Sequence, residues 1–81
     1  MIKKKTSVSL SSFKIVFDRE EDGRWIAEIP QLPGVLAYGK TKQEARRRVS
    51  AVALRTLADN VEQGRTLTPV SRLFDYEVAG R

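Results

Sequence analysis

Four carboxylates stand close together in the first third of the chain, at Asp18, Glu20, Glu21 and Asp22. Carboxylate oxygens are the ligands that divalent cations such as Ca²⁺ prefer. Their spacing differs from that of a calcium-binding loop, and the cluster runs into Asp22-Gly23, a dipeptide typical of a tight hairpin. We therefore interpret the cluster as a solvated hairpin tip. A metal-dependent hydrolase that uses these side chains stays open as an alternative.

Other groups that could do chemistry are scarce. The chain contains no cysteine and no histidine. This removes the thiolate nucleophile, the usual general base near neutral pH and the commonest nitrogen ligand for metals. The inward positions of the first predicted strand, Phe13, Ile15 and Phe17, are apolar and bring no carboxylate to a metal site. We expect a protein that is not an enzyme, with no catalytic residue, no metal and no cofactor.

Positive charge gathers at two places in a chain of net charge +5. One is Lys3–Lys5, and the other spans the start of a predicted helix, at Lys40, Lys42, Arg46, Arg47 and Arg48. Cations near a helix N-terminus oppose the macrodipole, but the cost is a few tenths of a kcal/mol each and sequences tolerate it. A solvated face is the simplest interpretation. A patch for the phosphates or carboxylates of a partner is the alternative.

A chain of 81 residues, with 41% hydrophobic and 31% charged side chains, is expected to form one globular domain over residues 1–81. A domain of this size buries only roughly 60–65% of its unfolded surface, so self-association would help to stabilise it. Residues 1–11 are expected to form a loose basic arm that pairs with the sheet from about Val8. The polar residues after Lys5 exclude a signal peptide, and no run is long enough to span a membrane. A cytoplasmic location is expected.

The hydrophobic pattern predicts an α+β fold of order β-β-β-α-β, with one four-stranded, mostly antiparallel sheet and a single helix packed on one face. The strands are expected at 13–18, 25–29, 35–39 and 71–78, and the helix from about Thr41 to Gln63 with Gly64 after it. Trp25, Ala27 and Ile29 share a face of the second strand. Trp25 could stack on a nucleic-acid base, but a buried core aromatic is the favoured interpretation.

The predicted helix is apolar on two sides. One side, with Ala45, Val49, Val52, Ala53 and Thr56 at helical spacing, suits packing on the sheet. Leu54, Ala58 and Val61 point roughly the other way, with Leu57 between the two sets. Because a single sheet covers only one side, either the last strand or another chain must cover the second. We expect a homodimer that buries Leu54, Ala58 and Val61 together.

Two motifs link the chain to a known family. A Gly-aromatic-x-Ala-x-x-Pro-x-Leu-Pro-Gly run is nearly matched by Gly23, Trp25, Ala27, Pro30, Leu32, Pro33 and Gly34, and a Gly-x-Thr-x-x-Glu-Ala run is matched by Gly39, Thr41, Glu44 and Ala45. With both motifs at this spacing, the chain resembles the HicB-type antitoxin domain of type II toxin–antitoxin systems, over roughly residues 13–78. The motif residues themselves suit turns, a helix cap and packing.

The resemblance implies a partial ribonuclease-H-like sheet and binding to a small HicA-type toxin, an mRNA endoribonuclease. It also implies oligomerisation. Many members carry a C-terminal DNA-binding domain, whereas this chain ends just after the last predicted strand, so direct DNA binding is not expected. Val35 stands where many members have Cys. The basic residues at 40–48 would repel a basic toxin, so the toxin should bind elsewhere or through an acidic patch of its own. A small nucleic-acid-binding protein that uses Lys3–Lys5 and Lys40–Arg48 is the alternative function.

Overall fold

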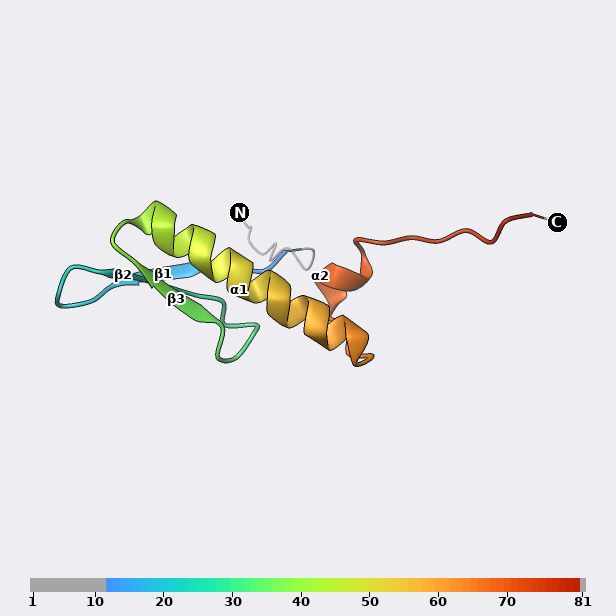
Figure 1. Ribbon diagram of the computed structural model, residues 1–81, viewed down its shortest axis with the longest axis horizontal. Coiled ribbons are helices and arrows are strands. Elements are labelled where there is room, and N and C mark those ends of the chain that lie inside the picture. Colours follow the sequence, from blue (N-terminus) through green and yellow to red (C-terminus); the bar gives the residue numbers. More distant parts are fainter. Residues whose placement is uncertain (1–11, 81) are drawn as a thin grey trace, which may run out of the picture.

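The computed structural model describes residues 12–80. Strands β1 (Val16–Arg19), β2 (Trp25–Glu28) and β3 (Leu36–Gly39) are followed by the long helix α1 (Lys42–Glu62) and one short helix, α2 (Thr68–Ser71). The helix α1 lies across one face of the sheet and continues beyond its end (Figure 1). The architecture is therefore α+β, a three-stranded antiparallel sheet with a long helix packed against it. The basic arm expected at residues 1–11, with Lys3–Lys5 and the pairing from Val8, lies outside the described residues.

The sheet has the order β1-β2-β3, so β1 and β3 are its two edges. Phe17 pairs with Ala27, which pairs with Ala37, and this row faces α1. Because side chains alternate along a strand, the next residues face away from the helix. The ladder of β1 begins at Val16 rather than at the predicted residue 13. The backbone N–H of Lys14 instead donates to the Gln31 side chain at 2.9 Å, which holds this segment beside the loop between β2 and β3.

The loop between β2 and β3 contributes directly to the core. The backbone N–H of Ile29 donates to Val35 at 3.1 Å, and that of Val35 donates to Leu32 at 2.9 Å. These bonds fold the proline-containing segment inward, so that Leu32 and Val35 are both 3% exposed. Gly34 adopts a φ of +86° in this loop, a conformation that costs glycine little and other residues more.

The helix approaches the sheet closely because the contact residues are small. Ala27, Ala45 and Val49 are completely buried. Gly39, the last residue of β3, is also buried, and a Cβ atom there would lie 2.5 Å from the backbone nitrogen of Ala45. Gly39 therefore permits the close approach of α1 to β3, where the sequence had predicted only a turn.

The predicted fourth strand at 71–78 is wrong, and so is the prediction of a single helix. Residues 68–71 form α2, with a proline in its first turn, where the missing N–H costs nothing. Beyond α2, residues 74–80 have no regular secondary structure and run away from the body of the molecule (Figure 1). We call residues 73–80 the tail. The alternation of apolar and polar residues predicted a strand there, but alternation does not specify which strand such a segment would pair with.

Among residues 12–80, neither helix is long and apolar enough to cross a membrane.

We predict that Gly39→Ala lowers the free energy of unfolding by on the order of 1–3 kcal/mol, because the added methyl group meets backbone atoms of α1 that cannot rotate away. Gly80→Ala is the control, since a Cβ at Gly80 has no neighbour within 4 Å. Urea denaturation of both variants measures the difference. An equal midpoint for Gly39→Ala and the unmutated chain would contradict the close approach.

Candidate functional site

The start of α1 is held by a capping arrangement. Thr41 is the N-cap residue, and its Oγ1 accepts from the backbone N–H of Glu44 at 3.0 Å. The Glu44 carboxylate accepts in return from the backbone N–H of Lys40 at 2.6 Å, one residue before the cap. This hydrogen bond lowers the pKa of Glu44; burial opposes the shift, and the charges of Arg48, Arg47 and Lys40 add to it.

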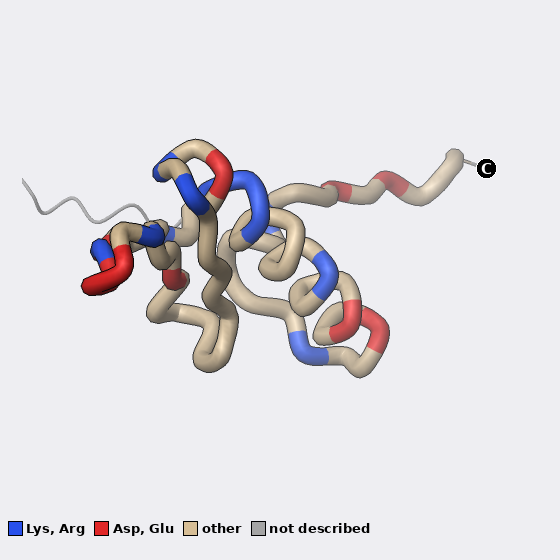
Figure 2. The backbone as a smooth tube through the Cα atoms, turned by 60° about the vertical axis from the view of Figure 1, so that its left-hand side comes forward, with Lys and Arg blue, Asp and Glu red and all other residues tan. Residues whose placement is uncertain are grey.

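The basic cluster at the start of α1 is only partly available to a ligand. Figure 2 shows basic residues gathered at the start of the helix, where the acidic Glu44 stands between Lys42 and Arg46. Arg48 is engaged, because it pairs with Glu44 at 3.1 Å and donates to the carbonyl oxygen of Tyr38 at 3.1 Å. Lys42 lies 5.1 Å from the ring centroid of Phe17. Lys42 and Arg46 line a slot of about 380 Å³, together with Gln43 and Phe17. We call this cavity the β1 slot.

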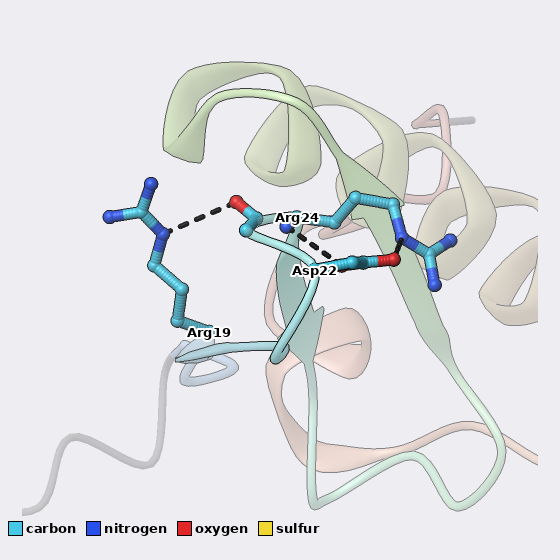
Figure 3. Close-up of polar contacts among 4 residues, drawn as sticks. Arg19, Asp22 and Arg24 are labelled. Atoms are coloured by element: carbon cyan, nitrogen blue, oxygen red, sulfur yellow. Dashed lines mark hydrogen bonds and ion pairs between the residues drawn. The ribbon is translucent and has the colours of Figure 1, made fainter.

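Among the acidic residues at 18–22, Asp22 stabilises the hairpin between β1 and β2. Asp22 pairs with Arg24 at 2.8 Å and accepts from the backbone N–H of Arg24 at 3.0 Å (Figure 3). That backbone bond is the main reason why the pKa of Asp22 is lowered. Arg19 donates to the carbonyl oxygen of Gly23 at 3.2 Å and closes the turn. Within residues 12–80, no three carboxylates are grouped so that they could hold a metal ion.

Trp25 belongs to a structural cluster of aromatic rings and cations. It is half-buried and meets Phe17 edge-to-face, with the ring centroids 6.5 Å apart. Arg19 lies over the Trp25 ring at 4.8 Å, and Lys42 is 5.7 Å from the same ring. A nucleic-acid base would have to displace these cations in order to stack on the ring. The arrangement is therefore closer to the core interpretation of Trp25 than to a stacking platform.

A groove between α1 and α2 brings the three expected self-association residues together. Leu54, Ala58 and Val61 line it, and Leu54 is 66% exposed. The groove measures about 350 Å³, and its remaining lining residues are Leu57, Glu62, Val70, Leu73 and Phe74. Sequence reasoning missed the contribution of residues 70–74, because it assigned 71–78 to a strand. The Thr68-Pro69 pair, typical of a helix start, was the signal that could have found α2. We call this feature the α1–α2 groove.

The face of the sheet that points away from α1 is also uncovered in the described part of the chain. Its side chains form two rows across the strands, Val16–Glu28–Leu36 and Asp18–Ile26–Tyr38. Val16 and Leu36 are 45% and 40% exposed. We call these residues the outer sheet face. It combines apolar side chains with two carboxylates and with Arg24, which pairs with Asp22 and lies 4.5 Å from the centroid of the Tyr38 ring. The cations of the basic cluster belong to the first turns of α1 and Lys40 before it.

Comparison with known proteins identifies the family. A UPF0150-like family profile matches residues 13–66, which include the whole sheet and α1. The chain belongs to the UPF0150-like family. It is 39% identical over 33 residues to the UPF0150 protein Ta0767 of Thermoplasma acidophilum, a match that covers 41% of this chain and 48% of that protein. The chain thus spans about half the length of this curated relative. No solved structure matches the chain.

We predict that the bond between Glu44 and Lys40 makes the start of α1 sensitive to acid. A carboxyl group whose folded-state pKa is lowered adds stability above its unfolded pKa, and this stability is lost as the pH falls through the folded pKa. An NMR titration should therefore find the Glu44 carboxyl titrating below an ordinary glutamate. Glu44→Gln should remove this part of the acid dependence of unfolding, whereas Glu28→Gln, which removes a charge far from the cap, should not. Titration of Glu44 at an ordinary value would contradict the capping bond.

Proposed function

We propose that this protein is an antitoxin that binds a HicA-type mRNA endoribonuclease toxin and covers its active surface, without catalytic activity of its own. Membership of the UPF0150-like family, together with the HicB-type motifs, is the observation that carries the proposal. The motif residues support the frame: Thr41 and Glu44 cap α1, Ala27, Leu32 and Ala45 are buried, and Gly34 shapes the loop. The frame leaves other surfaces free for a partner.

The outer sheet face is the surface on which we place the toxin. An enzyme that binds mRNA carries a basic surface. The outer sheet face offers Asp18 and Glu28 beside the exposed Val16 and Leu36, so it supplies opposite charge and apolar area together. The basic cluster on α1 would repel the same partner. This charge difference between the two surfaces favours the outer sheet face.

We predict that Leu36→Lys, and separately Val16→Lys, weaken binding of the toxin by on the order of 2 kcal/mol or more, because a lysine would be buried against a basic partner. The measurement is copurification and growth rescue when the chain is coexpressed with the product of the adjacent reading frame. Arg47→Ala, in the basic cluster on α1, is the matched control and should bind normally. An adjacent product that neither binds nor arrests growth would overturn the antitoxin proposal. So would reproducible RNA cleavage by the purified chain that disappears in Asp18→Asn.

We further propose that the protein forms a homodimer through the α1–α2 groove. The groove presents Leu54, Val61, Leu73 and Phe74, and each of these side chains is at least 43% exposed. A twofold axis at this place would bury the same apolar patch twice. The gain would be substantial for a small domain, at about 25 cal/mol for each Å² of apolar surface removed from water.

We predict that Leu54→Asp weakens the dimer, because it would bury a carboxylate that has no partner. Sedimentation at micromolar protein concentration compares Leu54→Asp with Arg55→Asp, a neighbouring exposed position outside the groove. Only Leu54→Asp should shift the population toward monomer. A monomeric unmutated chain would contradict the homodimer.

A further inference from the structure

The tail exposes an unusual amount of apolar surface. Phe74, Tyr76 and Val78 are 77%, 88% and 79% exposed. These side chains alternate with Asp75 and Glu77, which is the period-two pattern of a strand with one covered face. In the structure, the backbone of the tail is extended from the end of α2 into solvent (Figure 1). The segment thus has the sequence pattern of an edge strand, but it does not pair with the sheet of its own chain.

The outer edge of strand β1 could accept such a strand. Strand β1 is an edge of the sheet, so one side of its backbone is unpaired within residues 12–80. The apolar side chains beside this edge, Phe13, Ile15 and Phe17, are only partly buried. Phe17 also forms one wall of the β1 slot, whose other walls include the cations Lys42 and Arg46. An added strand with large apolar residues on its inner side would cover these rings.

We propose that residues 73–80 of one copy add as an edge strand to β1 of a second copy, reciprocally. Phe74, Tyr76 and Val78 would then lie on the same face as Phe13, Ile15 and Phe17. Eight extended residues reach roughly 26 Å, which is enough to run beside residues 13–19. The proposal rests on the self-association proposed above.

A second copy is the occupant that the arrangement favours. The tail leaves the α2 end of the molecule in the direction opposite to its own sheet (Figure 1). Its first residues, Leu73 and Phe74, line the α1–α2 groove. A twofold axis at that groove would therefore direct each tail towards the sheet of the second copy. Within one copy, α2 lies beside the segment that precedes β1, since Phe13 and Pro69 line one shared pocket.

The exchange would also enlarge the toxin-binding surface. With Phe74, Tyr76 and Val78 facing inward, Asp75 and Glu77 would project on the side of Asp18 and Glu28. The outer sheet face of each copy would then gain two carboxylates from its partner. Each binding surface would be complete only in the dimer.

Disulfide cross-linking tests the pairing directly, because the chain has no cysteine of its own. Val16→Cys would be combined with Asp75→Cys or with Glu77→Cys, all on the predicted outer side, and oxidised under mild conditions. At least one pair should form a covalent dimer. Val16→Cys with Tyr76→Cys is the control, because the two side chains would face opposite sides of the sheet. A cross-link closed within one chain, or equal linking in the control, would overturn the exchange, as would no linking at either outer position.

Sedimentation of Tyr76→Asp and Val78→Asp gives a second readout, because neither residue lines the α1–α2 groove. Both residues are exposed in the single chain, so the variants should keep their circular dichroism spectrum while the dimer weakens on the order of tenfold or more. An unweakened dimer would overturn the proposal. The covalent dimer can then be tested against the adjacent reading frame's product. Cross-linking without toxin binding would leave the exchange intact and refute the antitoxin function instead.

Discussion

The close contact between small residues of β3, β2 and α1 is the constraint on which the rest of the structure depends. A side chain at Gly39 would collide with the backbone of α1, and Ala27 and Ala45 leave no room for larger groups. This contact fixes the distance between helix and sheet. Because small residues bury little apolar area each, it also limits the core. The largest apolar side chains consequently lie around that contact, where Phe17 and Trp25 are half-buried, or outside it, where Leu54 and Phe74 are exposed.

Charge divides the molecule in a related way. Cations occupy the start of α1 although they oppose its dipole, and Arg48 and Lys42 are held there by Glu44 and by the ring of Phe17. The opposite face of the sheet carries Asp18 and Glu28 between apolar side chains. A partner that approaches either side therefore meets a different combination of charge and apolar surface. For a protein proposed to recognise a basic enzyme, this difference selects the orientation of binding.

Local signals predicted much of the fold. Alternation in β2, the Asp22-Gly23 turn and the Thr41–Glu44 cap each depend on residues a few positions apart, and the structure places β2, the turn and α1 where these signals indicated. The strand prediction failed at residues 71–78, because a strand forms only beside another strand and the sequence does not show which strand that would be. The roles of Gly39 and of Leu73 depend on which elements meet in space. For the same reason, the outer sheet face could be recognised only after the register of the three strands was known.

The order of the strands affects how fast the protein folds. Every strand of the sheet pairs with the strand next to it in the chain, and α1 follows directly. Contacts between neighbours in sequence close short loops, which lowers the entropic barrier and speeds folding. The sheet and α1 can therefore fold without the tail. In the proposed homodimer, folding of the single chain and assembly of two copies would be separate events, so protein concentration would govern the second without slowing the first.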